Sequence, residues 1–259
     1  MKLISVNIWV KLDNCSSVIA FLRSENADII CLQEVSSTPS WNQSKYNKKQ
    51  YIDQELSLLY PFCYRWPLFS TSSLGTSARD VWWVMEQGNY ILSKLPILEW
   101  KNEFYHKEYS YITDWSDWRS SNHGRALTSA KIKTPHWDVF IANVHGCRTS
   151  DKLWTERTKK QIDFFINTCA KYEQVILVWD FNLLPETEEI KLIDSLYTNA
   201  GKKYWITATR SDFNDWLDKW NQIVDYILIS QKLKINTFTV PNLPISDHLP
   251  LIAEFDFSC

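Results

Sequence analysis

Short apolar runs that end in a polar side chain most constrain how this chain can fold. Residues 27–34 and 174–179 are almost wholly apolar, and Glu34 and Asp180 close them. Strands without polar alternation are typical of sheets that are covered on both faces. Segments with helical spacing of apolar residues, such as residues 155–172, alternate with these runs. The alternation predicts an α/β architecture.

The same patterns predict the other elements. Strands are predicted at residues 2–10, 27–34, 63–69, 81–87, 90–92, 97–106, 126–132, 139–144, 174–179, 223–230, 237–240 and 251–257. Helices are predicted at residues 16–25, 54–59, 155–172 and 185–196. Residues 36–50 and 107–122 are polar and predict irregular segments. Because no repeat and no linker interrupts this order, we predict a single domain over residues 1–259.

Charge and composition exclude several classes of protein. The net charge of −2 excludes a strongly basic nucleic-acid binder held by charge alone. No apolar run reaches the roughly 18 residues that a membrane-spanning helix needs. The 6 cysteines contain no Cys-x-x-Cys pair, which favours reduced thiols. We therefore predict a cytoplasmic protein, with a monomer as the default state.

Carboxylates, amides and imidazoles gather where the predicted strands end. The set comprises Asn7, Glu34, His145, Asp180, Asn182, Asp225, Asp247 and His248. Each residue alone has a structural explanation, as a strand-end or turn residue. Charged side chains are rarely buried unless they are paired or bind a metal, so the set indicates a site. Its oxygen-rich donors suit Mg²⁺, Mn²⁺ or Ca²⁺ rather than structural zinc.

Six short motifs occur in a fixed order from residue 5 to residue 248. They are Ser5-Val6-Asn7, Leu32-Gln33-Glu34, Asn143-Val144-His145, Asp180-Phe181-Asn182, Val224-Asp225-Tyr226 and Ser246-Asp247-His248. In this order they resemble the endonuclease/exonuclease/phosphatase superfamily, which contains the DNase I-like and exonuclease III-like phosphoesterases. The resemblance implies a four-layer α/β sandwich, in which helices flank two central mixed β-sheets. It also implies hydrolysis of a phosphoester with Mg²⁺, or with Mn²⁺.

The resemblance further implies a role for each motif residue. The implied metal ligands are Glu34, Asn7 and Asp247. The implied catalytic residues are Asp180, Asn182, His145, Asp225 and His248. In this interpretation Asp180 orients or deprotonates the attacking water, and His248 with Asp225 stabilises the phosphoryl charge or protonates the leaving oxygen. The implied phosphate contacts are Asn7, Asn143 and Arg125.

The substrate class stays open at this point. A phosphodiester cleaved by a nuclease-like enzyme is the leading interpretation, and a lipid or inositol phosphate is the alternative. A nucleic acid partner would use the basic residues Lys45, Lys48, Lys49, Arg119 and Arg125, which could equally serve solubility. No basic amphipathic helix indicates binding to a membrane surface.

The chain has 14 tryptophans and only 5 glycines among 259 residues, although glycine averages about 7% of residues. Trp179 stands where the superfamily has glycine before Asp-Phe-Asn. Six more lie at turn-like, helix-entry or family-glycine positions: Trp82, Trp83, Trp137, Trp154, Trp216 and Trp220. Our hypothesis is that several are glycines, encoded by UGA and translated as tryptophan. Otherwise the protein is rich in tryptophan, and Trp179 would obstruct the site beside Asp180 and leave a catalytically weak binding module.

Overall fold

The computed structural model describes residues 1–8, 15–38, 47–73, 80–112, 122–149, 151–211 and 222–256. The strands are β1 (Lys2–Asn7), β2 (Ile29–Ser37), β3 (Phe62–Ser73), β4 (Asp80–Ser93), β5 (Ile97–His106), β6 (Tyr111–Ile112), β7 (Arg125–Lys133), β8 (Asp138–His145), β9 (Val175–Asp180), β10 (Thr198–Asn199), β11 (Asp225–Ile229), β12 (Lys234–Thr239) and β13 (Leu251–Asp256). The helices are α1 (Cys15–Glu25), α2 (Lys48–Leu56), α4 (Glu156–Cys169), α5 (Glu188–Leu196) and α6 (Ala200–Lys203).

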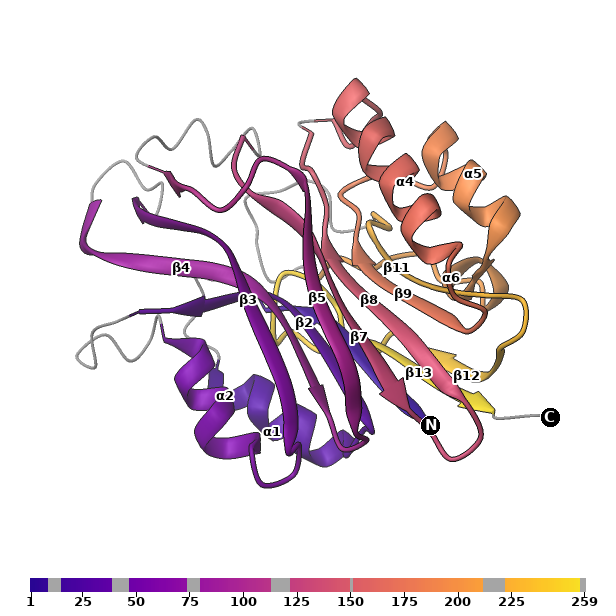
Figure 1. The fold of residues 1–259 in the computed structure, drawn as a ribbon, viewed down its shortest axis with the longest axis horizontal. Coiled ribbons are helices and arrows are strands. Elements are labelled where there is room, and N and C mark those ends of the chain that lie inside the picture. Colours follow the sequence, from indigo (N-terminus) through magenta and orange to yellow (C-terminus); the bar gives the residue numbers. More distant parts are fainter. Residues whose placement is uncertain are drawn as a thin grey trace.

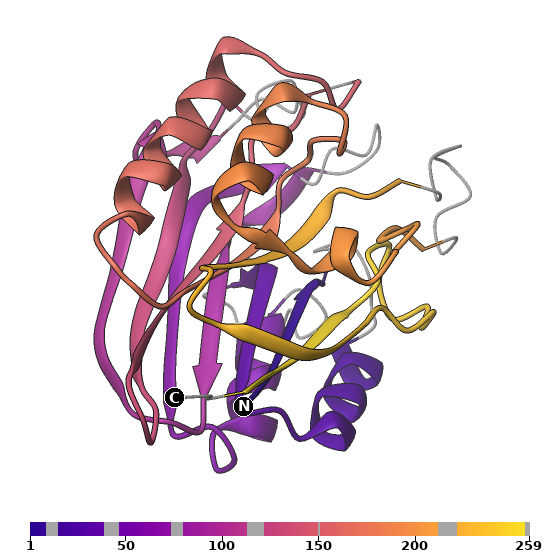
Figure 2. The ribbon, with the colours of Figure 1, turned by 90° about the vertical axis from the view of Figure 1, so that its right-hand side faces the viewer.

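The described strands form two mixed sheets. One has seven strands in the order β12-β13-β1-β2-β4-β3-β6, and the other has six in the order β10-β11-β9-β8-β7-β5. The sheets lie face to face, with α1 and α2 outside the first and α4 and α5 outside the second (Figures 1 and 2). This arrangement confirms the predicted four-layer sandwich. None of the described helices has the length and apolar character needed to cross a membrane.

Three apolar clusters explain why the strand sequences are so apolar. Cys31 and Val178 belong to the cluster between the two sheets. Their strand neighbours Leu32 and Leu177 belong to the outer clusters beneath the helices. Because successive side chains of a strand point to opposite faces, β2 and β9 must be apolar on both sides. The same alternation determines which polar side chains at the strand ends face one another.

The boundaries differ from the predictions where tertiary contacts decide them. Helix α2 begins at Lys48, inside the segment predicted to be irregular, and ends at Leu56 rather than at residue 59. Its N-cap is Asn47, whose side chain accepts a hydrogen bond from the Gln50 backbone N–H. Lys48 Nζ donates to the Ile8 carbonyl, so a buried tertiary contact fixes the polar first turn. The two strands predicted at residues 81–87 and 90–92 are one strand, β4.

Some elements were not predicted, and some predictions cannot be compared. The two-residue strands β6 and β10 and the short helix α6 have no signal in the periodicity. Strand β12 begins at Lys234, three residues before the predicted start. Residues 9–14, 39–46 and 113–121, which include parts of predicted elements, lie outside the described residues.

The topology brings the motif-bearing strand ends to one edge. Strand β8 runs parallel to β9, and His145 is the register partner of Asp180. Strand β11 is antiparallel to β9, so its first residue, Asp225, also pairs with Asp180. In the other sheet β1 ends at Asn7 beside Gln33 of β2, directly before Glu34. The ends of both sheets therefore supply polar side chains to the same region.

Candidate active site

The Asp180 carboxylate is the centre of the polar cluster. Its Oδ2 accepts a hydrogen bond of 3.0 Å from Asn7 Nδ2 in the opposite sheet. The same oxygen lies 3.6 Å from the Nε2 atoms of both His145 and His248. Its Oδ1 accepts a 3.1 Å hydrogen bond from the Asn182 backbone N–H. One buried carboxylate thus connects strand ends of both sheets and both site imidazoles.

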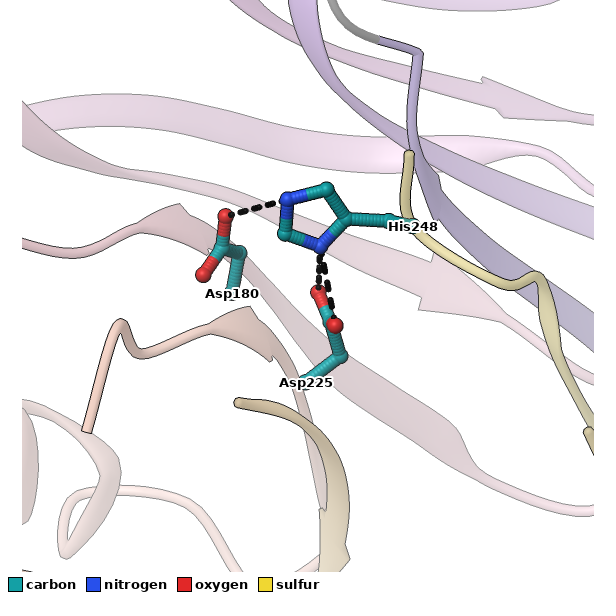
Figure 3. Close-up of side chains that lie close together, drawn as sticks. All are labelled: Asp180, Asp225 and His248. Atoms are coloured by element: carbon teal, nitrogen blue, oxygen red, sulfur yellow. Dashed lines mark hydrogen bonds and ion pairs between the residues drawn. The ribbon is translucent and has the colours of Figure 1, made fainter. Parts of the chain in front are cut away.

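His248 lies between two carboxylates (Figure 3). Its Nδ1 is 2.9 Å from each oxygen of Asp225, and its Nε2 faces Asp180. Ligand atoms of these three buried residues lie within 4.8 Å of one another. The short contact to Asp225 assigns the proton to Nδ1, since a ring N–H donates to a carboxylate at this distance. Asp225 therefore orients the imidazole, whose Nε2 points into the site.

Glu34 occupies the other side of the cluster. Its Oε1 accepts from Asn7 Nδ2 at 3.2 Å, and its Oε2 accepts from Gln87 Nε2 at 2.9 Å. The backbone of Glu34 has a φ of 56°, at a register shift between β2 and β4. Strained backbone and β-bulges next to a functional site re-aim side chains. Here the irregularity aims the carboxylate at Asn7.

Asp247 approaches from the loop before β13. Its Oδ2 forms a 2.7 Å ion pair with Arg210 Nη2. Arg210 Nη1 also contacts His248 Nε2, so the guanidinium bridges two adjacent motif residues. The neighbouring Ser246 Oγ donates to the Asn7 carbonyl at 2.7 Å, which joins this loop to the end of β1.

The charges of the cluster shift its pKa values in opposite directions. Burial raises the pKa of Glu34, and the nearby Asp247 and Asp180 raise it further. Burial also raises the pKa of Asp225. Burial opposes ionisation of Asp180 as well, but the two imidazoles and Lys152 outweigh it and hold its pKa below the usual range. Asp180 therefore stays ionised while its neighbours carry unfavourable negative charge.

The pKa values of the two imidazoles also shift in opposite directions. Burial and the Arg125 guanidinium hold the pKa of His145 well below its ordinary value. Burial and Arg210 also oppose a charge on His248, but the carboxylates around it outweigh them and raise its pKa. Groups whose environments separate their pKa values are typical acid and base pairs. The surroundings therefore favour the protonated form of His248 and the neutral form of His145.

The donor set fits a hard divalent cation. The carboxylates of Glu34, Asp180 and Asp247 offer oxygen atoms, which such cations prefer, whereas Asn7 turns its Nδ2 toward Glu34 and Asp180. Burial and then the nearby Asp247 and Asp180 raise the pKa of Glu34, and a bound cation would stabilise its ionised form.

Two predicted phosphate contacts, Asn143 and Arg125, form hydrogen bonds with neighbouring protein groups. Asn143 Nδ2 donates to the carbonyls of Leu32 and Tyr90, and its Oδ1 accepts from Gln33 Nε2. The amide groups of Asn143 are therefore used in hydrogen bonds between the sheets, and its role as a phosphate contact stays a prediction. Arg125 is buried, and its Nη1 donates to the His145 carbonyl at 3.2 Å. Arg125 thus supports the strand that carries His145, and its role as a phosphate contact stays a prediction.

Three residues of the site were missed by sequence reasoning. Gln87 holds Glu34, Arg210 bridges Asp247 and His248, and Lys152 Nζ donates to Asn182 Oδ1. Burial lowers the pKa of Lys152 to about 7. Arg210 and Lys152 lie outside strands and Gln87 lies inside one, so none ends an apolar run. The one available signal was that Lys152 follows the His145 strand end in a loop, where functional residues concentrate.

The expected obstruction by Trp179 is wrong. Its indole packs under the helices, edge-on to Phe165 with 4.0 Å between ring centroids. Asp180 is the next residue of β9, so its side chain points to the opposite face. Trp179 therefore lies outside the polar cluster. Trp216 and Trp220, and the side chains of Trp82 and Trp83, lie outside what the structure describes.

The basic residues that could bind a nucleic acid give little support to a nucleic acid partner. Lys48 is buried against the Ile8 carbonyl, and Lys49 pairs with Asp53. Lys45 and Arg119 lie outside the described residues.

Comparisons with known proteins agree with the fold. The sequence matches the Endonuclease/Exonuclease/phosphatase family over residues 4–248. An endonuclease/exonuclease/phosphatase from Beutenbergia cavernae superposes with a TM-score of 0.78 at 14% identity, covering 98% of this chain and 71% of that one. A family protein from Leptotrichia buccalis gives 0.73 at 16% identity, covering 99% and 100%. A mannosyl-6-phosphatase from Bacteroides thetaiotaomicron gives 0.68 at 12% identity, covering 99% and 100%. A search of curated proteins found no match.

Proposed function

Because the chain belongs to the endonuclease/exonuclease/phosphatase family, we propose that it hydrolyses a phosphoester with a divalent metal, and specifically a phosphodiester. One observation carries the proposal. Asp180 lies between an oriented imidazole, His248 with Asp225, and a second carboxylate group around Glu34. A phosphate between them would meet a proton donor on one side and metal ligands on the other.

The residues of the site have different roles in the proposed reaction. A cation held by Glu34, Asn7 and Asp247, Mg²⁺ or Mn²⁺, would neutralise phosphate charge and polarise the phosphoryl oxygen. Asp180, which stays ionised, accepts a hydrogen bond from the attacking water and aims it at phosphorus.

The bond changes balance in one displacement. The water oxygen forms the new bond to phosphorus and gives one proton to Asp180. The bond from phosphorus to the leaving oxygen breaks, and His248 in its doubly protonated form, with Arg210 Nη1 displaced from Nε2, gives that oxygen the Nε2 proton. Asp225 stabilises the imidazolium until the proton leaves. Solvent then returns the proton from Asp180 to His248.

The proposal is tested by metal dependence and by Glu34→Gln. The purified chain is assayed on plasmid DNA, an abasic oligonucleotide and bis(p-nitrophenyl) phosphate, with Mg²⁺, Mn²⁺ or a chelator. We expect metal-dependent hydrolysis that Glu34→Gln largely removes while circular dichroism shows an intact fold. Glu99→Gln, an exposed carboxylate on β5, is the matched control. Hydrolysis that survives both chelation and Glu34→Gln would contradict the assignment.

A further inference from the structure

Lys152 is a cation inside the site that the reaction described above does not use. Its side chain is partly buried, and its Nζ donates a hydrogen bond to Asn182 Oδ1. The Asn182 backbone N–H in turn donates to Asp180 Oδ1 at 3.1 Å. Glu34 and Asn7 lie on the Oδ2 side of the same carboxylate. Lys152 and the implied metal ligands therefore lie on different sides of Asp180.

The backbone holds Lys152 in this place. Its φ is 61°, a left-handed conformation that lysine rarely adopts. The Lys152 carbonyl accepts a 3.1 Å hydrogen bond from the Leu184 backbone N–H, just after Asn182. The residues that flank Lys152 are also joined, because Thr149 Oγ1 donates a hydrogen bond to the Leu153 carbonyl at 3.1 Å. Strain that persists because its surroundings fix it is typical of functional positions.

The electrostatic surroundings of Lys152 point to an anion. Asp180 and Asp225 attract its charge, whereas Arg148 and Arg210 oppose it. Among the described residues its Nζ donates to a neutral amide oxygen, although a partly buried ammonium gains most from a charged partner. A phosphate oxygen beside Lys152 would offset the repulsion from Arg148 and Arg210.

We propose that Lys152 binds a non-bridging oxygen of the substrate phosphate, on the Asn182 side of Asp180. This inference rests on the proposed phosphoesterase function. In its protonated form Lys152 supplies a monovalent positive charge on the side away from Glu34. The phosphate then lies between a cation held by the Glu34 group and the ammonium of Lys152. Asn182 positions the lysine through the Nζ–Oδ1 hydrogen bond.

The proposal is tested with inorganic phosphate, the simplest ligand with the same oxygens. Calorimetry measures phosphate binding to the wild type, Lys152→Met, Lys152→Gln and Lys152→Arg, and bis(p-nitrophenyl) phosphate gives kcat/KM. Two neutral variants are included so that one remains if the other does not fold. Lys160→Met, on the exposed face of α4, is the matched control.

We expect both neutral variants to bind phosphate at least tenfold more weakly. Their kcat/KM should fall by about 10²–10³-fold, as for loss of one preorganised donor. Lys152→Arg should restore most of the phosphate affinity because it keeps the charge, and Lys160→Met should behave as the wild type. A separate Mn²⁺ titration should show no loss of metal affinity in Lys152→Met.

Two results would overturn the inference. One is unchanged phosphate binding in folded neutral variants. The other is a loss of Mn²⁺ affinity that accounts for the phosphate effect, which would make Lys152 a support for the metal site. The two proposals fail in distinguishable ways. If the wild type hydrolyses none of the phosphoesters but its phosphate binding depends on Lys152, the proposed function fails and this inference stands.

Discussion

At the scale of the residue, His248 and Asp225 form a directly hydrogen-bonded pair, with 2.9 Å between Nδ1 and either carboxylate oxygen. We predict that Asp225→Asn lowers kcat by about 10²–10⁴-fold with little change in KM. The reason is that the carboxylate orients and charges the imidazole, which matters most as charge develops in the transition state. Steady-state kinetics with bis(p-nitrophenyl) phosphate measure the change.

His248→Ala should cost a similar factor, and the double variant little more, since the two residues act as one unit. Urea midpoints of all three variants separate this from a structural role. Additive losses in kcat, or losses that follow stability alone, would contradict the pairing.

The backbone conformation of Trp205 leads to a second prediction, which concerns stability. It follows α6 with a φ of 58°, and its side chain is 88% exposed. The next residue, Ile206, donates its backbone N–H to the Gly201 carbonyl at 2.9 Å, the pattern of a helix end that favours glycine. We predict that Trp205→Gly raises the free energy of unfolding by about 1 kcal/mol, as urea denaturation would show.

Trp205→Ala is the control, since alanine shares the left-handed penalty and should give no such gain. This site extends the hypothesis of recoded glycines to a position that sequence context did not indicate.

The packing of Trp179 bears on the same hypothesis. The ring centroids of Trp179 and Phe181 are 3.3 Å apart, below the roughly 4.5–7 Å usual for aromatic pairs. Mass spectrometry of the natural protein decides the matter, and tryptophan in peptides covering positions 179 and 205 would end the hypothesis.

At the scale of the element, the close approach of β8 and β9 at their ends depends on Gly146. Its backbone N–H donates to the Asp180 carbonyl at 2.7 Å, and a Cβ there would lie 2.5 Å from the Phe181 carbonyl oxygen. We predict that Gly146→Ala lowers the free energy of unfolding by about 1–3 kcal/mol, because the strand ends must separate. Activity should fall with it, since His145 moves relative to Asp180.

Thermal unfolding and kcat/KM are both measured for this variant. Gly201→Ala is the control: its Cβ meets Asn199 Oδ1 at 3.4 Å, an ordinary contact, and alanine favours α6. If Gly146→Ala were as stable and active as Gly201→Ala, the close approach would not be required.

At the scale of the whole molecule, stability depends on pH through buried imidazoles. His123 is 1% exposed, and burial and Arg125 hold its pKa well below 6.5. It therefore stays neutral in the fold, while the unfolded chain takes up a proton below its ordinary pKa. The sign follows: stability falls as pH drops below about 6.5, by about 1.4 kcal/mol at pH 5.5 for one such group.

His123→Phe tests this, because it keeps a ring against Phe69 but removes the titration. Between pH 7.5 and pH 5.5 the wild type should lose about 1.4 kcal/mol more unfolding free energy than the variant. Equal losses in the two proteins, measured by urea denaturation at both values, would show that His123 does not carry this dependence.

The fold class could be predicted from the sequence, as could most of the residues proposed for the site. Burial on both faces leaves a local trace, an apolar run without alternation, which β2 and β9 show. A carboxylate at the end of such a run is also a local signal, so Glu34 and Asp180 could be identified before any contact was known. The order of the six motifs added the family, and with it the four layers.

Only the tertiary structure decided which polar residues meet. Asn143 and His145 lie two residues apart on β8 and face the same side, yet Asn143 is one step deeper, about 6–7 Å along the strand. It therefore meets the backbone of the opposite sheet, while His145 reaches Asp180. No pattern in the sequence connects Lys152 with the other residues of the site. Its position depends on a left-handed backbone and on the hydrogen bond from the Leu184 backbone N–H. Such placements depend on strand depth, bulges and loop closure, which no local pattern of residues encodes.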